Sequence, residues 1–210
     1  MGLLGLLFKD PLTFVFLVPL LLYSVIAHEV AHGWVAFWFG DKTAKYAGRL
    51  SLNPKDHLDP IGTLAIFLVG FGWAKPVPVD YLSLRSRRAM ISVSLAGCLV
   101  NIIIATLAIF LLQFTFIRTN QWLGVIFVIT ARINIILGAL NLIPIPPLDG
   151  YRVLSEFLPV DFKYRLMRLE PYGFFIIIGL LWLGILGPVI SFVYNLILGL
   201  IGILLSFTGR

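Results

Sequence analysis

Residues 24–33 of the chain have the sequence SVIAHEVAHG, which places His28, Glu29 and His32 inside an apolar segment running from about residue 13 to residue 39. About 20 apolar residues are enough to cross the hydrocarbon core of a membrane, so this segment is predicted to be a transmembrane helix. Ionisable side chains are costly at that depth and are usually functional. The three polar residues therefore mark the candidate functional site.

The spacing of the two histidines indicates a metal site. His28 and His32 are four residues apart, so they lie one turn apart on the same helix face. Two imidazoles in this arrangement can bind one Zn²⁺ ion, and Glu29 can take a proton from a water on the metal, which makes a nucleophile for a peptide carbonyl. The alternative is three polar groups satisfied by hydrogen bonds, for which a membrane core offers few partners.

The composition is typical of a polytopic membrane protein rather than a soluble domain with a signal peptide. The 210 residues are 60% hydrophobic and 12% charged, and the mean hydropathy is +0.99. The net charge of +6 is explained by basic loops that face anionic lipid, so we expect a lipid bilayer and no nucleic acid as the partner. We expect one domain over residues 1–210.

The apolar runs predict an all-α fold with five to six transmembrane or re-entrant helices. After the first span, residues 89–114 and 123–143 are each long enough to cross the membrane. Residues 61–70 are too short to span and are predicted to be re-entrant. Residues 171–207 are predicted to form a C-terminal helical hairpin that turns at Gly187-Pro188.

Polar residues interrupt two of these spans. Asn101 lies within the run 89–114, and we predict that it makes a hydrogen bond between helices, with a role in the site as the lesser alternative. Arg132 and Asn134 lie within the next run and are predicted to face protein or water.

Two stretches predict a small strand or loop element. Residues 48–54 alternate briefly between apolar and polar side chains, which favours a short strand. Residues 70–79 are rich in Gly and Pro, and we predict a strand or loop beside the active-site cleft, where an exposed edge pairs with an extended substrate. An ordinary connector is the alternative for this second stretch.

A hydrolytic zinc takes three protein ligands and leaves one position open for water. The candidates for the third ligand are His57, Asp59 and Asp149. Prolines at positions 144, 146 and 147 predict that the chain unwinds here, which holds Asp149 rigidly on irregular backbone at membrane depth. Asp149 is therefore favoured, and Gly150 leaves room beside it. His57 is expected at the membrane interface and Asp59 is expected to cap a helix.

The distribution of Lys and Arg predicts the orientation. Loops 40–58, 73–88 and 150–170 carry four Lys or Arg residues each, whereas the connection 116–121 carries one. By the positive-inside rule the three basic loops are cytoplasmic. We therefore expect an integral, multi-pass cell membrane protein with its active site toward the cytoplasmic side.

The chain resembles the site-2 protease family of intramembrane zinc metalloproteases, peptidase M50. The resemblance rests on HEVAH at residues 28–32, on NLIPIPPLDG at residues 141–150 and on the Gly-rich stretch 70–78. The sequence SLAG at residues 94–97, followed by Asn101, is similar to a further family pattern. Together these motifs cover about residues 24–155, which we expect to be the core of the domain.

The resemblance implies one catalytic zinc ion per chain, held by His28, His32 and Asp149, with Glu29 as general base. It also implies that Asn141 holds the substrate or stabilises the oxyanion through its amide. The alternative for Asn141 is a cap on the broken helix, and both roles can hold at the same time. The expected activity is endopeptidase cleavage in or near transmembrane segments of other proteins. The chain looks like a compact form of the family without a PDZ domain.

Two other functions were weighed against proteolysis. A membrane metal transporter needs polar groups at successive depths and often shows repeated halves, whereas here the metal-type residues collect at one depth. A catalytically silent zinc-binding scaffold is disfavoured by the presence of Glu29. Prenyl-protein processing proteases share the His-Glu-x-x-His pattern, but the stretch 141–150 points away from them.

Overall fold

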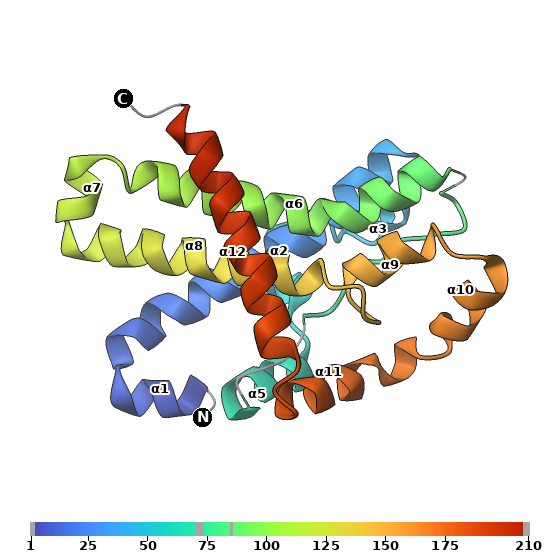
Figure 1. The fold of residues 1–210 in the computed structure, drawn as a ribbon, viewed down its shortest axis with the longest axis horizontal. Coiled ribbons are helices and arrows are strands. Elements are labelled where there is room, and N and C mark those ends of the chain that lie inside the picture. Colours follow the sequence, from blue (N-terminus) through green and yellow to red (C-terminus); the bar gives the residue numbers. More distant parts are fainter. Residues whose placement is uncertain (1–2, 70–73, 85, 208–210) are drawn as a thin grey trace.

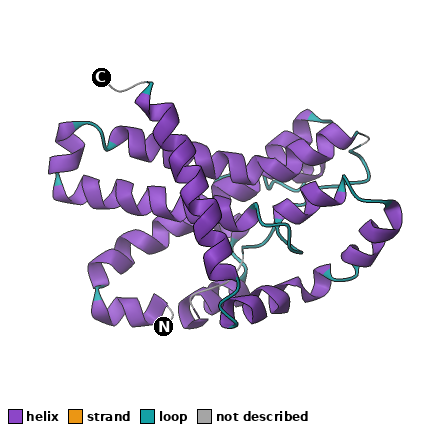
Figure 2. Ribbon diagram, viewed as in Figure 1, coloured by secondary structure: helices purple, strands orange, loops and turns teal. Residues whose placement is uncertain are grey.

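The computed structural model describes residues 3–69, 74–84 and 86–207, and these residues form helices, turns and loops without a strand (Figure 2). Four of the described helices are long and apolar enough to cross a membrane: α2 (Pro11–Trp38), α6 (Arg87–Leu111), α8 (Gln121–Asn141) and α12 (Leu186–Ser206). The shortest have 21 residues, which correspond to about 32 Å at 1.5 Å per residue. The chain is an all-α polytopic membrane protein, as predicted.

Two further apolar helices are too short to cross a membrane. α5 (Pro60–Val69) and α11 (Gly173–Trp182) have ten residues each, or about 15 Å. Together with the four spans they agree with the predicted five to six transmembrane or re-entrant helices. The remaining helices are short: α1 (Leu3–Lys9), α3 (Thr43–Tyr46), α4 (Pro54–His57), α7 (Thr115–Thr119), α9 (Asp149–Ser155), α10 (Val160–Met167) and the 3-10 turn η1 (Glu170–Tyr172).

The centre of the fold is the pair α6 and α8, which run side by side and are joined at one end by α7 (Figure 1). α2 packs against both of these helices, and α12 crosses over them. Small residues on α6 and α8 allow bulky side chains of α12 to approach closely. The buried cluster at this crossing consists of Ala105, Ile135, Ala139, Ile197, Ile201 and Leu205.

Local signals in the sequence set the ends of α2. Asp10 caps the helix, because its carboxylate accepts a hydrogen bond of 3.1 Å from the Thr13 N–H, and Pro11 occupies the first turn. Gly40, with φ of +100°, follows the C-terminal end, where glycine adopts the left-handed conformation without strain. The predicted first span is confirmed to within two residues.

The chain unwinds after α8, as its prolines predict. Residues 142–148 are not helical, and Asp149 is the first residue of α9. The expectation that Asp149 lies on irregular backbone is therefore wrong, because α9 begins as soon as the prolines end. Gly150 packs directly on the carbonyl oxygen of Leu142, a contact that leaves no space for a Cβ atom.

Two sequence-based expectations about the backbone are wrong. Residues 48–54 do not form a strand: Gly48 has φ of +66°, and the N–H of Arg49 donates to Ala44 O at 2.9 Å, which closes the end of α3 instead. The last two apolar runs turn at Gly184, with φ of +73°, rather than at Gly187-Pro188. Pro188 lies in the first turn of α12, where its missing N–H costs little.

The close contact at Gly150 generates a prediction about stability. Replacing Gly150 by Ala forces α9 away from the end of α8, a type of overpacking that costs about 1–3 kcal/mol. At about 2–4 °C per kcal/mol for a chain of this size, thermal unfolding in detergent should shift downward by several degrees. Gly199→Ala on α12 is the control, because a Cβ there meets nothing within 4 Å. Equal midpoints for the two variants would contradict the packing at Gly150.

Candidate metal centre

Two buried histidines of α2 face each other. His28 is 6% exposed and His32 is 7% exposed. Their Nε2 atoms lie 3.2 Å apart, and their rings are nearly perpendicular, with centroids separated by 4.8 Å. The four-residue spacing therefore places both imidazoles on one helix face, as predicted.

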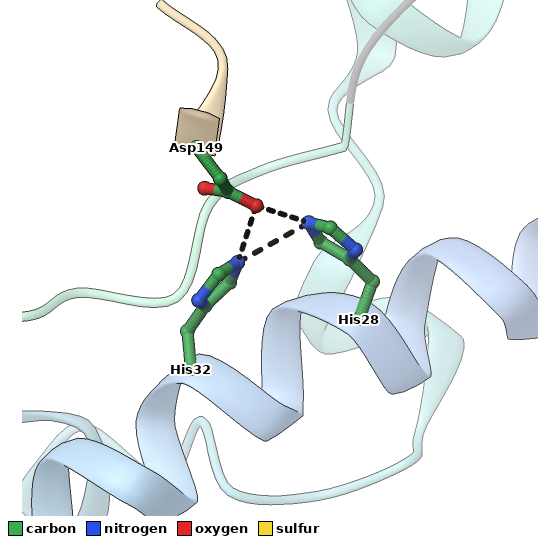
Figure 3. Close-up of side chains that lie close together, drawn as sticks. All are labelled: His28, His32 and Asp149. Carbon is green, nitrogen blue, oxygen red and sulfur yellow. Dashed lines mark hydrogen bonds and ion pairs between the residues drawn. The ribbon is translucent and has the colours of Figure 1, made fainter. Parts of the chain in front are cut away.

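Asp149 completes a cluster of three groups. Its Oδ2 atom lies 3.1 Å from His28 Nε2 and 3.2 Å from His32 Nε2 (Figure 3). The carboxylate comes from the N-terminal end of α9, on the far side of the unwound segment from α8. Among the described residues these three form the group of His, Cys, Asp and Glu side chains that can hold a metal ion.

The spacing of the cluster fits zinc. Zinc binds imidazole nitrogen and carboxylate oxygen at about 2.0–2.2 Å in tetrahedral geometry, which separates neighbouring ligand atoms by roughly 3.3–3.5 Å. The three observed separations of 3.1 to 3.2 Å lie close to this value. Protons alone would fit poorly, because N–H groups on both Nε2 atoms, 3.2 Å apart, would repel each other.

The outer nitrogens of both imidazoles are anchored by other helices. His32 Nδ1 lies 2.6 Å from the carbonyl oxygen of Val93 on α6, and because a carbonyl can only accept, Nδ1 carries the proton. His28 Nδ1 lies 2.6 Å from Oδ1 of Asn101, also on α6. Metal-binding histidines are commonly oriented in this way through the nitrogen that does not bind the metal.

Gly97 provides the space for the cluster. A Cβ atom at this position on α6 would lie 2.5 Å from Nε2 of both His28 and His32. From the sequence, Gly97 is one of the small residues suited to close helix packing, but a glycine within a helix gives no sign of which side chains approach it. Next along α6, the buried Cys98 thiol points at Asp149 Oδ2 from 3.8 Å.

Glu29 is half-buried and contacts the loop segment 74–79. Its Oε2 atom accepts a hydrogen bond of 3.0 Å from the backbone N–H of Val77. The predicted strand or loop beside the site is therefore a loop over residues 74–79, and residues 70–73 lie outside the described part of the chain. Val77 could not be identified from the sequence, because every residue except proline has a backbone N–H and the residue type does not show which one is used.

Arg49 and His57 hold this segment in place. The Arg49 guanidinium donates to Lys75 O at 2.8 Å and to Pro76 O at 3.2 Å, and the Lys75 N–H donates to His57 O at 2.8 Å. His57 itself is fully buried, with Nε2 donating to Ser51 O at 2.8 Å. The expectation that His57 lies at the depth of the membrane interface stays a prediction, because burial within the protein does not fix its depth in a membrane.

Asp41 fastens the other end of the segment to the end of α2. It is 2% exposed, and its carboxylate accepts hydrogen bonds from the N–H groups of Thr43 at 2.9 Å and Asp80 at 2.8 Å. Burial raises the pKa of this carboxyl, but the hydrogen bonds outweigh burial and bring the pKa below its ordinary value. Asp41 therefore remains charged at neutral pH and holds the backbone at Thr43 and the backbone at Asp80 close together.

The remaining candidates form hydrogen bonds with groups outside the three-residue cluster. Asp59 accepts a hydrogen bond of 2.7 Å from the Gly62 N–H, which confirms its predicted role as the cap of α5. Asn141 is half-buried at the end of α8, and its amide donates to Leu137 O at 3.0 Å within the same helix. This bond fits the alternative interpretation of Asn141 as a residue that closes the broken helix.

The sequence of the chain is similar to those of known proteins. Residues 117–184 match the model of "Peptidase family M50". The chain is 40% identical over 173 residues to "Putative zinc metalloprotease YwhC" of Bacillus subtilis (strain 168), covering 79% of each protein. It is 31% identical over 177 residues to "Putative zinc metalloprotease Rip2" of Mycolicibacterium smegmatis, covering 80% of this chain and 67% of the relative. No solved structure matches the chain.

A helix with His-Glu-x-x-His and a carboxylate brought up to both imidazoles is the arrangement of a zinc metalloprotease. The chain belongs to peptidase family M50, and its cofactor is zinc.

The contact at Gly97 predicts the effect of adding one methyl group to the metal centre. Gly97→Ala pushes the two imidazoles apart, so the purified variant should retain far less than the one zinc per chain expected of the wild type. Zinc content is measured by elemental mass spectrometry. The control is Gly138→Ala on α8, because its Cβ would make only ordinary contacts, the nearest at 3.5 Å. A full zinc content in Gly97→Ala would contradict the geometry of the cluster.

Proposed function

We propose that this zinc metalloprotease is an intramembrane endopeptidase of the site-2 protease type, which hydrolyses peptide bonds in or near transmembrane segments of other proteins. The observation that carries the proposal is the position of His28 and His32 on a helix long enough to span a membrane. They precede the C-terminal end of α2 by ten and six residues, or about 15 and 9 Å. A metal held there acts within the membrane rather than above it.

The residues at the site have different roles in the proposed hydrolysis. His28, His32 and Asp149 would hold the zinc ion, which supplies a Lewis acid that polarises the scissile carbonyl and acidifies water. Glu29 takes a proton from the attacking water and then passes it to the leaving amine. The Val77 N–H, 3.0 Å from Glu29 Oε2, orients this carboxylate.

Asn141 is the proposed polar contact with the substrate. Its amide would hold the substrate or stabilise the negative oxygen that forms on the attacked carbonyl. In the structure one N–H of this amide bonds to Leu137 O, which leaves the second N–H to donate to the substrate. The substrate must also unwind locally, because helical carbonyls already accept hydrogen bonds and are shielded.

The charge distribution supports a site that opens toward the cytoplasm. α3, α9 and α10 belong to basic loops and lie at one end of the α6 and α8 pair, while α7, with its single Arg118, lies at the other end (Figure 1). By the positive-inside rule the basic end is cytoplasmic. Asp149 begins α9 and therefore lies at this end.

The role of Glu29 distinguishes a protease from a silent zinc scaffold or a transporter. Glu29→Gln keeps the shape of the side chain but removes the base, so zinc should remain while cleavage of labelled transmembrane peptides falls by at least about 10²–10⁴-fold. The control is Glu156→Gln, which alters only a carboxylate paired with Lys163 outside the spans. Normal cleavage by Glu29→Gln would refute the general-base role, and wild-type protein that binds zinc without cleaving any peptide would favour the scaffold.

A further inference from the structure

A buried network of hydrogen-bonded polar side chains joins three spans next to the metal cluster. Asn101 on α6 and Asn134 on α8 are both fully buried, and Ser24 on α2 is 5% exposed. We refer to Ser24, Asn134 and Asn101 as the amide ladder. It ends at His28, which is why its hydrogen-bond directions bear on the metal site.

The orientation of the Asn134 side-chain amide is determined by the groups around it. Its Nδ2 atom lies 2.9 Å from Thr130 O and 2.8 Å from Ser24 Oγ. Thr130 O can only accept, so the NH₂ group of Asn134 must face it. The Ser24 hydroxyl donates to Leu20 O at 2.7 Å, which leaves its oxygen free to accept from Asn134. The Oδ1 atom of Asn134 is therefore the atom that faces α6.

The same reasoning fixes Asn101. Its Nδ2 atom lies 2.7 Å from Asn134 Oδ1 and 3.3 Å from the backbone oxygen of Ser24, both of which are acceptors. Reversing the Asn101 amide would place two acceptors face to face at 2.7 Å. Its Oδ1 atom must therefore face His28 Nδ1, which lies 2.6 Å away. An amide oxygen can only accept, so the histidine must donate.

We infer that the amide ladder sets the tautomer of His28, with the proton on Nδ1 and the lone pair on Nε2 directed at the metal position. Asn101 is a positioning residue that acts through His28, and Asn134 acts through Asn101. This inference rests on the proposed role of His28 as a zinc ligand. It goes beyond a structural role, because hydrogen bonds that only join helices would not depend on which histidine nitrogen carries the proton.

His32 provides an internal comparison. Its Nδ1 proton is held by the backbone carbonyl of Val93, which no side-chain substitution removes. His28 has a side-chain amide in the same place. Substitutions in the ladder should therefore change His28 and leave His32 unchanged, which a general loss of folding would not do.

The first test is ¹⁵N NMR of histidine-labelled, zinc-free full-length protein carrying Asp149→Ala, at a pH where both imidazoles are neutral. Asp149→Ala removes the carboxylate that would otherwise draw a proton onto either Nε2 atom when zinc is absent. In this parent protein, His28 and His32 should both carry the proton on Nδ1. In Asn101→Leu, His28 should shift toward the tautomer protonated on Nε2, while His32 remains as before. Thr106→Val is the control, because its hydroxyl bonds only to Ile102 O within α6. In the parent protein that carries Asp149→Ala, His28 with its proton on Nε2 would overturn the inference, even if Asn101→Leu fails to fold.

The second test is zinc affinity, measured by competition with a chelator. Asn101→Leu should raise the zinc dissociation constant by roughly 10–100-fold, the usual effect of losing a partner of a metal-binding histidine. Asn134→Ala should raise the zinc dissociation constant less. Asn101 stays in place in this variant, but it loses the acceptor that fixes the orientation of its amide. Thr106→Val should bind zinc as the wild type does. Wild-type affinity in both ladder variants would overturn the inference while leaving the proposed function intact.

Failure of the proposed function would have a different signature. If the wild type does not bind zinc, the zinc site itself is refuted. The tautomer of His28 is measured without metal, so it still decides whether the amide ladder holds the proton on Nδ1.

Discussion

Three atoms that accept hydrogen bonds meet inside the protein: Nε2 of His28, Nε2 of His32 and Oδ2 of Asp149, at separations of 3.1 to 3.2 Å. Acceptors at this distance repel unless a cation lies among them. A metal ion satisfies all three at once, whereas protons on both imidazoles would face each other. The arrangement of the spans follows from the need to deliver these atoms to one point.

Each neighbouring element contributes to that delivery. α2 supplies both imidazoles, and α6 holds their outer nitrogens through Val93 O and Asn101 while leaving space at Gly97. The break after α8 lets α9 turn Asp149 back toward α2. The loop over residues 74–79 supplies the donor to Glu29. The three side chains of the cluster and Glu29, the proposed general base, are thus held by different parts of the fold.

Much of this could be predicted from the sequence, because helical spacing and helix-breaking residues act locally. The spacing of His28 and His32 predicts their common face, and the prolines before Asp149 predict the break. The contacts of Gly97, Asn134 and the Val77 N–H could not be predicted, because they depend on how separate helices pack. The turn at Gly184 was misplaced because Gly187-Pro188 is an equally strong local signal, and only the structure shows that Pro188 fits the first turn of α12.

X-ray absorption spectroscopy at the zinc edge, on the purified full-length chain loaded with one zinc, would identify the atoms that bind the metal. We expect two imidazole nitrogens and a carboxylate oxygen, with all ligand atoms at about 2.0–2.2 Å. A thiolate sulfur at about 2.3 Å, which the single cysteine, Cys98, would supply, or fewer than two imidazoles would contradict this ligand set.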